Sequence, residues 1–153
     1  TYKWFCEMML PNLEIGAKRK GRTLKDIDLG GHGFIGCGKT EKGLEAVRKR
    51  LRVRIALYAS TPEYRPMLEM HGWEDLFSPL IDLAHQDKWE EMGDLVTDEM
   101  LDEYAVVGTP EEVPQKLKAR FGGLTQRIQM DDEWFEEMSE SDIEKLIKDI
   151  QKI

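Results

Sequence analysis

Two strand-like runs, separated by long helical stretches, constrain the fold of this chain more than any other feature. The first run, from Ile27 to Gly38, is punctuated by glycines, and the second, from Leu124 to Met130, has Ile128 at its apolar centre. Strands that are connected through helices pair in parallel, so the pattern predicts an α/β fold with a parallel sheet. Two parallel strands do not make a sheet that buries both faces. We therefore expect either a part of a larger parallel fold or helices that pack into a more self-contained unit.

Residues that typically start or break helices divide the helical stretches into separate elements. A first helix is expected over residues 2–20, with Pro11 either kinking it or starting its main part. Thr40 is placed to cap a long helix over residues 40–60, in which apolar residues recur at spacings of three and four. Residues 61–104 follow as short helical pieces that are broken by glycine and proline.

Two further helices are expected towards the end of the chain. Thr109, Pro110 and Glu112 match a capping box with proline in the first turn of a helix. Ser141 and Glu144 match a second capping box, which would open an amphipathic closing helix. The order of elements is thus helix, strand, helix, helical insertion, helix, strand, helix, in a single domain over residues 1–153.

Charge and composition exclude several classes of protein. The 153 residues carry 30 acidic and 22 basic side chains, a formal net charge of -8, which argues against nucleic acid as a partner. One basic cluster, within residues 48–54, is interpreted as a solvated helix face balanced by acidic segments, with phosphate binding and nucleic-acid binding as alternatives. No apolar stretch is long enough to span a bilayer.

The cysteines and histidines predict no metal site. Cys6 and Cys37 have neither metal-ligand spacing nor the pattern of a disulfide framework, and the three histidines are scattered. The first residues also lack the basic region and the apolar core of a signal peptide. These observations favour free cysteines in a reducing cytoplasm.

Three motifs resemble one protein family. Residues 59–73, Ala-Ser-Thr-Pro-Glu-Tyr-Arg-Pro-Met-Leu-Glu-Met-His-Gly-Trp, are similar to a segment of the luciferase-like monooxygenases, closest to the branch usually assigned to coenzyme F-420. Residues 106–113, Val-Val-Gly-Thr-Pro-Glu-Glu-Val, resemble the family element that opens the helix before the last barrel strand. Leu-Pro-Asn-Leu-Glu at 10–14 and Gly-Arg at 21–22 resemble the helix before the seventh strand. The acidic segment 131–142 matches no part of this pattern.

The resemblance implies a helix-rich, partial (β/α)8 TIM barrel, made of the last βα units with a helical insertion at about residues 61–104. It implies an oxidoreductase or monooxygenase that holds coenzyme F-420, or alternatively FMN, at the carboxyl-terminal mouth of the barrel. Such enzymes transfer a hydride between the cofactor and an organic substrate. The resemblance implies that much of the cofactor contact comes from strands one to six, which this chain does not contain. We therefore expect the chain alone to be inactive and not to bind the cofactor.

Six residues are candidates for binding cofactor or substrate, and no catalytic residue is assigned. His32 lies in the glycine-rich strand, where a neutral imidazole both donates and accepts hydrogen bonds; a structural histidine is the alternative. Gly36 lies where this strand is expected to leave at the mouth, and close approach of a cofactor and turn geometry explain it equally well.

Tyr64, Arg65, His71 and Trp73 form the main candidate group. If residues 62–72 form one helix, Tyr64 and His71 share a face of it. Arginine binds phosphate or carboxylate with two hydrogen bonds, and tyrosine and tryptophan stack on planar rings. The alternative is that these aromatic residues only pack the insertion against the barrel wall.

The alternative to an enzyme is a non-catalytic, α-rich module that associates with itself. A partial barrel leaves strand edges and apolar helix faces uncovered, so we expect a homo-oligomer. The helical insertion distinguishes the two hypotheses. An insertion that folds over the strands lets the chain stand alone, whereas an insertion that stays outside leaves the strands to a partner or to the missing strands.

Overall fold

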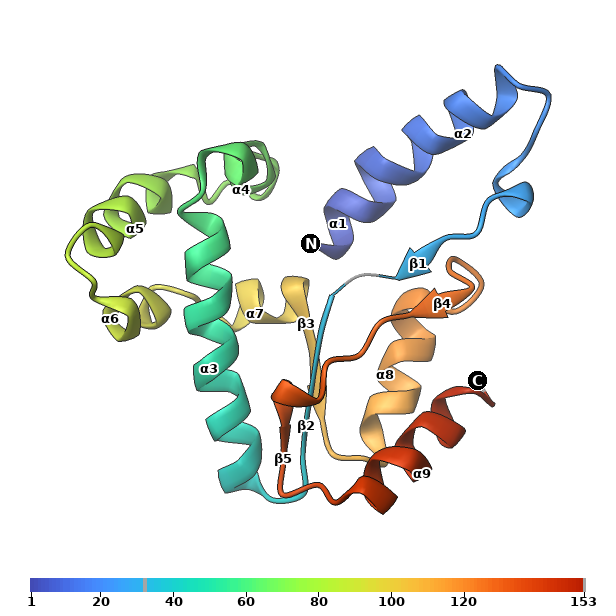
Figure 1. The fold of residues 1–153 in the computed structure, drawn as a ribbon. Helices are drawn as coiled ribbons and strands as arrows, with labels where there is room; N and C mark the ends of the chain where they lie inside the picture. Colours follow the sequence, from blue (N-terminus) through green and yellow to red (C-terminus); the bar gives the residue numbers. More distant parts are fainter. Residues whose placement is uncertain (32, 153) are drawn as a thin grey trace.

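The computed structural model of the chain describes residues 1–31 and 33–152 (Figure 1). Its helices are α1 (Tyr2–Trp4), α2 (Leu10–Lys18), α3 (Glu41–Ala59), α4 (Arg65–His71), α5 (Phe77–Ala84), α6 (Trp89–Asp94), α7 (Asp98–Tyr104), α8 (Glu112–Phe121) and α9 (Glu140–Ile150). Its strands are β1 (Gly30–Gly31), β2 (Phe34–Gly38), β3 (Ala105–Gly108), β4 (Arg127–Ile128) and β5 (Phe135–Glu136). All described strand pairs are parallel, which confirms the predicted helix-rich, parallel α/β fold.

Short irregular turns connect these elements. A π-helical turn (Phe5–Met9) joins α1 to α2, so the two form one rod that projects from the rest of the molecule (Figure 1). Pro11 lies in the first turn of α2, which confirms that it starts the main part of this helix. The 3-10 turns are Leu24–Asp26, Pro62–Tyr64, Glu74–Leu76 and Asp132–Trp134.

The central sheet has the strand order β3-β2-β5. Phe34 of β2 lies opposite Ala105 of β3, and Cys37 lies opposite Phe135 of β5. The sequence predicted β2 but neither of its neighbours. β3 falls on a short apolar run, Tyr104 to Val107, that was not assigned to a strand, and β5 lies inside the acidic segment 131–142, which carried no strand pattern.

The smaller ladder, β1 with β4, extends the pairing of β2 with β5 towards the other end of the strands (Figure 1). Gly31 lies opposite Ile128, and Cys37 lies opposite Phe135. Gly31 and Cys37 are six residues apart, whereas their partners are seven residues apart. The 3-10 turn Asp132–Trp134 accommodates the extra residue, as a bulge does.

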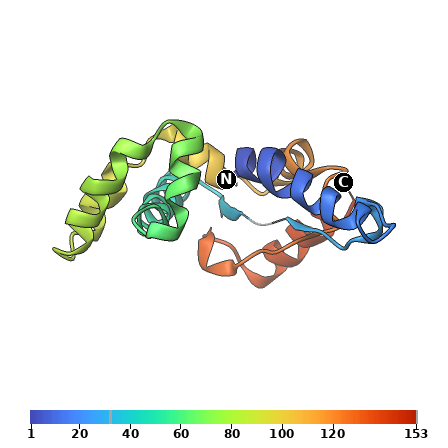
Figure 2. The same cartoon turned by 90° about the horizontal axis from the view of Figure 1, so that it is seen from above.

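Helices cover both faces of the central sheet (Figure 2). Side chains alternate along β2, so Ile35 and Cys37 share a core with α8 and α9. Gly36 faces the other side, where a Cβ on Gly36 would lie 2.4 Å from Cγ1 of Val47 in α3. The sheet is larger than the two strands expected from the sequence, and α3 lies on one face while α8 and α9 lie on the other.

The helical insertion packs on α3, on the side away from the sheet (Figures 1 and 2). Leu51 and Ile55 of α3 share one core with Leu80 of α5 and Met92 of α6, and all four are buried. Gly93 of α6 permits close packing, since a Cβ there would lie 2.8 Å from a side-chain atom of α3. The insertion thus stays outside the sheet, and whether a partner or the missing strands cover the strand edges stays a prediction.

Two of the three predicted helix starts are confirmed. The Thr40 hydroxyl accepts a hydrogen bond from the Gly43 amide at 3.1 Å. Thr109 and Glu112 cap each other: the Thr109 amide donates to the Glu112 carboxylate at 3.1 Å, and the Glu112 amide donates to the Thr109 hydroxyl at 3.3 Å. The local sequence therefore determines where these helices begin.

The third predicted start, at Ser141 and Glu144, is wrong. The cap of α9 is Ser139, and its capping-box partner is Asp142. The Asp142 carboxylate accepts the Ser139 amide at 2.9 Å, while the Ser141 hydroxyl lies 3.0 Å from the Ser139 hydroxyl. Ser139–Asp142 and Ser141–Glu144 have the same spacing. The pair that forms is Ser139–Asp142, which starts the helix two residues earlier.

We expect Gly36→Ala to destabilise the protein by about 1–3 kcal/mol, the usual cost of overpacking a core. The added methyl group meets Val47, which is 0% exposed and has no free space to move into. The free energy of unfolding in urea measures the effect. Gly16→Ala in α2 is the control, because a Cβ there meets nothing within 4 Å and alanine favours a helix. Equal effects of the two substitutions would contradict the described seating of α3.

Candidate functional site

The carboxyl ends of β2, β3 and β5 meet at one edge of the sheet because the three strands are parallel. Turns lead from this edge into α3, α8 and α9 (bottom of Figure 1). Active sites of parallel α/β proteins lie at this edge. We refer to it as the carboxyl edge, and to the opposite end of the strands as the amino edge.

The turn from β2 into α3 is unusually tight. A Cβ on Gly38 would lie 2.8 Å from the Leu44 amide nitrogen, so only glycine lets the helix start directly against the strand. Thr40 caps α3 and also donates its hydroxyl proton to Oε2 of Glu137, at 2.8 Å. The first turn of α3 therefore lies at the carboxyl edge with its capping residue already engaged.

Glu137 supplies a carboxylate to the amino terminus of α3. Its backbone is left-handed, with φ 61°, a conformation that non-glycine residues adopt rarely. A Cβ on Gly43 would lie 2.9 Å from the Glu137 carboxylate, so the glycine leaves the space that this carboxylate fills. Negative charge is favourable at a helix amino terminus, where free amides and the helix dipole both attract it.

Lys39 and Asp142 form an ion pair at the carboxyl edge. The Lys39 ammonium lies 2.5 Å from Oδ2 of Asp142, which also accepts the Ser139 hydroxyl proton at 2.6 Å. These hydrogen bonds, that of Lys39 first, hold the pKa of Asp142 well below its usual range. The pair borders a cavity of 290 Å³ that Glu111 and Lys145 also line.

Cys37 lies directly behind this edge and is 0% exposed. Burial raises the pKa of its thiol to about 11, and the charge of Glu111 adds to the shift. A nucleophilic cysteine needs a lowered pKa and some exposure. Cys37 is therefore a packing residue.

The carboxyl edge of this chain does not by itself fit a deazaflavin or flavin. Its cavity of 290 Å³ is at the lower limit of small-molecule pockets, which measure about 300–1,000 Å³. Lys39 and Thr40, the groups suited to an anion, already bind Asp142 and Glu137. The edge therefore provides anchoring groups without a surface for a planar ring.

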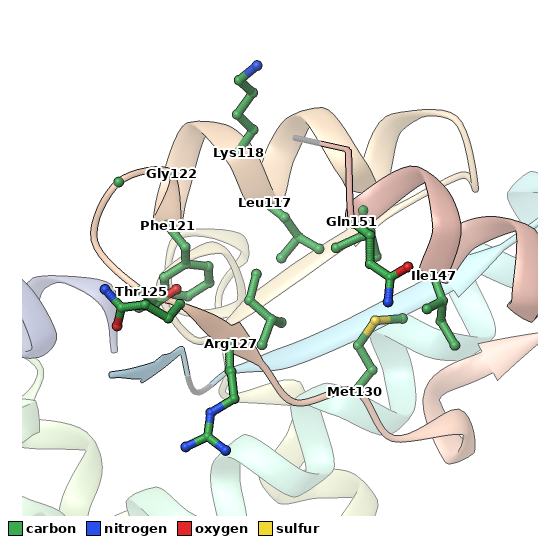
Figure 3. Close-up of a pocket in the computed structure, with 13 residues that line it drawn as sticks. Leu117, Lys118, Phe121, Gly122, Thr125, Arg127, Met130, Ile147 and Gln151 are labelled. Atoms are coloured by element: carbon green, nitrogen blue, oxygen red, sulfur yellow. The ribbon is translucent and has the colours of Figure 1, made fainter. Parts of the chain in front are cut away.

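A larger open pocket, of 590 Å³, lies between α8, β4 and α9. Figure 3 shows Leu117, Phe121, Met130 and Ile147 lining it, whereas Lys118 points away from it. Arg127, at its border, is paired with Asp28 at 2.7 Å. The pocket therefore has an apolar wall with a polar border, and the described residues of its lining include no carboxylate, histidine or cysteine for acid–base chemistry.

The main candidate group lies at the amino edge, because α3 runs from the carboxyl edge back past the start of β2 (Figure 1). Tyr64 packs edge-on against Tyr58, with ring centroids 5.7 Å apart, and lines a cavity of 410 Å³. Arg65 pairs with Glu69 at 3.0 Å and lies over the ring of Phe77. Tyr64 therefore lines a cavity, whereas Arg65 is held by Glu69 and Phe77. Neither side chain lies at the carboxyl edge.

His71 and Trp73 stack on each other, with ring centroids 4.1 Å apart and an angle of 9° between the rings. Nε2 of His71 lies 2.9 Å from the Thr1 hydroxyl and 3.8 Å from the Glu103 carboxylate. Burial lowers the pKa of His71, and Glu103 partly opposes this shift. The pair fastens α4 to the start of the chain.

The two remaining candidates lie on the glycine-rich run. Gly36 faces Val47 of α3, so a neighbouring helix explains the need for glycine there without any cofactor. His32 lies outside the described residues. A binding role for any of the six candidates stays a prediction.

The sequence interpretation missed Lys39, Glu137 and Asp142. Gly33 to Thr40 has the spacing Gly-x-x-x-x-Gly-Lys-Thr of a phosphate-binding P-loop, which was a readable signal for Lys39. A P-loop requires a loop between its glycines, and Phe34–Gly38 is instead strand β2. No signal marked Glu137 or Asp142 within their run of acidic residues.

Over residues 1–31 and 33–152, no group of three or more potential metal ligands comes together. Within the same ranges, no helix has the length and apolar character needed to cross a bilayer.

The model of the luciferase-like monooxygenase family matches residues 5–126, so this chain belongs to that family. An uncharacterised protein of Mycobacterium tuberculosis and one of Mycobacterium bovis are each 36% identical to it over 126 residues. These alignments cover 82% of this chain and 37% of each relative. The 5,10-methylenetetrahydromethanopterin reductase of Methanolobus tindarius is 27% identical over 126 residues, which are 80% of this chain and 37% of the reductase.

The fold is that of part of a luciferase-like TIM barrel. The coenzyme F-420-dependent tetrahydromethanopterin reductase of Methanopyrus kandleri superposes with a TM-score of 0.70 over 94% of this chain and 40% of the reductase, at 22% identity. The chain thus spans well under half the length of the relatives it matches. The predicted partial barrel is confirmed.

We expect acid to weaken the packing of α9 at the carboxyl edge. The folded pKa of Asp142 lies below its unfolded value of about 3.9, so its stabilisation is present above that value and is lost as the pH falls towards the folded pKa. Asp142→Asn should lower the midpoint of thermal unfolding at pH 7 and flatten its fall between about pH 5 and pH 2. Asp82→Asn, on α5, is the control and should keep the wild-type profile. Identical pH profiles for all three proteins would rule out a role for the Lys39–Asp142 pair.

Proposed function

We propose that this chain supplies the last two barrel strands, and the turns that follow them, to an oxidoreductase that transfers a hydride between a deazaflavin or flavin and an organic substrate. One observation carries the proposal: β1 and β2 pair in parallel with β4 and β5. This pairing brings the turns of Lys39 and Glu137 together at the edge where a barrel holds its active site. Membership of the luciferase-like family supplies the class of chemistry.

Coenzyme F-420 is the cofactor that we favour, with FMN as the alternative. The structurally similar reductase of Methanopyrus kandleri is described as dependent on coenzyme F-420. In such enzymes the cofactor carries the redox step, and the protein binds and orients it. The two free cysteines fit a reducing cytoplasm, where we place the enzyme.

Within the complete enzyme, we assign this chain an anchoring role at the mouth. Lys39 and the amino terminus of α3 are suited to an anionic part of a cofactor or substrate. In the chain alone, Asp142 and Glu137 hold these groups. The isolated chain should therefore bind neither cofactor.

Titration of coenzyme F-420 and of FMN against the purified chain tests this proposal. We expect no change in cofactor fluorescence with the chain alone. A chimera, in which this chain replaces the matching 37% of the mycobacterial relative, should bind one of the two cofactors. Circular dichroism shows whether the chimera folds. A cooperatively folded chimera that binds neither cofactor would contradict the enzyme assignment. Tight binding by the chain alone would contradict the claim that its cofactor site is incomplete.

A self-associating module is the second candidate, and exposed apolar residues favour it. Met8 and Ile15 on the projecting α1–α2 rod are 39% and 51% exposed. Such side chains are suited to a second copy. Light scattering should then give a mass near twice 17.8 kDa, and the double variant Met8→Lys, Ile15→Lys should return it to 17.8 kDa. Leu57→Lys, at a 40% exposed position on α3, is the control. A wild-type mass of 17.8 kDa at all concentrations would remove this candidate.

A further inference from the structure

A cavity of 410 Å³ lies at the amino edge, opposite the proposed cofactor end. It is formed where the end of α3, the turn before α4, the start of the chain and the beginnings of β2 and β3 come together (upper part of Figure 1). Its volume falls in the range of small-molecule pockets, about 300–1,000 Å³. The proposed function does not use it, although one of the six candidate binding residues, Tyr64, lines it.

Six of the thirteen described residues that line the cavity are aromatic. The ring-bearing residues are Tyr2, Phe34, Tyr58, Tyr64, Tyr104 and Phe121. Tyr58 and Tyr64 stand at 84° to each other with centroids 5.7 Å apart, so they make a corner. Phe34 continues this wall, with its centroid 6.1 Å from that of Tyr58. Tyr58 and Tyr64 are each 39% exposed, so part of each side chain is accessible to a ligand.

The charged groups that line the cavity favour a positive ligand. Two of them, Glu103 and Asp131, are carboxylates, and one, Arg120, is a cation. Arg120 donates to the carbonyl of Ala105 at 2.9 Å and to that of Asp102; its charge remains, so the two carboxylates and one guanidinium leave one net negative charge. Burial lowers the pKa of the Thr1 amino group to about 6, so this group adds little charge above pH 7.

The cavity wall already carries one cation on an aromatic face. The guanidinium carbon of Arg120 lies 5.6 Å from the centroid of the Tyr2 ring. Positive groups within about 6 Å of an aromatic centroid are attracted by the negative face of the ring. The same attraction is available on the free faces of Tyr58 and Tyr64.

We propose that this aromatic cavity binds a small organic cation with a quaternary ammonium head group. The rings at the Tyr58–Tyr64 corner enclose the methyl groups, and the carboxylates of Glu103 and Asp131 supply the counter-charge. A quaternary ammonium suits this cavity because its methyl groups can pack on the ring faces while its charge is balanced by the two carboxylates. An anion is disfavoured by the same two carboxylates. The inference is independent of the proposed function, since the cavity lies at the opposite edge of the sheet.

Proton NMR with choline as the probe tests the proposal at pH 8. The choline methyl resonance should shift upfield on binding, because the ring currents of the surrounding aromatic residues act on it. Tyr64→Leu should weaken binding about 5–10-fold, whereas Tyr64→Phe, which keeps the ring, should bind as the wild type does. Asp131→Asn should weaken binding about 3-fold, and Asp132→Asn, outside the cavity, should leave it unchanged.

A neutral ligand of the same shape separates charge from size. The alcohol 3,3-dimethyl-1-butanol replaces the ammonium nitrogen of choline by carbon, and it should bind at least 5-fold more weakly. Equal binding of the two would mean an apolar hole without preference for a cation, and would overturn the proposal. Absence of an upfield shift, or binding by a folded Tyr64→Leu variant at wild-type strength, would overturn it as well.

Discussion

The close seating of α3 on β2, which glycines in the strand make possible, is the constraint on which the remaining packing depends. A Cβ at Gly36 or Gly38 would lie within 2.4 or 2.8 Å of atoms of α3, so the helix is as near to the strand as two elements can come. Gly93 lets α6 approach the other side of α3 in the same way. One helix thus holds the sheet and the insertion together, and its Leu51 and Ile55 are 0% exposed between them. Because protein interiors are close-packed, a displacement of α3 on one side is felt on the other.

Much of this fold could be predicted from the sequence, because the predictable parts are local. The periodicity of α3 and the capping of Thr40 and Thr109 are properties of neighbouring residues. β3 and β5 could not be predicted, because four and two residues are too short for a pattern and are strands only through β2. Trp134, buried beside Phe34 within an acidic run, is likewise a tertiary effect.

The candidate site was predictable only in part, for a geometric reason. The sequence located Gly36 to Gly38 near the carboxyl end of their strand, but it did not locate the Tyr64 group relative to the sheet. A helix of 19 residues is about 28 Å long, whereas a strand of five residues spans about 17 Å. The residues that follow α3 therefore lie at the amino edge. The basic cluster of α3 behaves as a balanced helix face. Its pairs are Arg48 with Glu41, Lys49 with Glu90, Arg50 with Glu136, Arg52 with Asp98 and Arg54 with Glu133.

The parallel pairing across the chain also sets an order of folding. Gly30 and Arg127 are 97 residues apart, and Cys37 and Phe135 are 98 residues apart, although each pair is in register. Contacts between distant residues form slowly because a long loop must close first, whereas α3 and the insertion meet through nearer segments. During synthesis, the α3 core can therefore form while β4 and β5 are still unmade. The carboxyl edge, where Glu137 and Asp142 meet α3 and Lys39, is then the last part of the molecule to assemble.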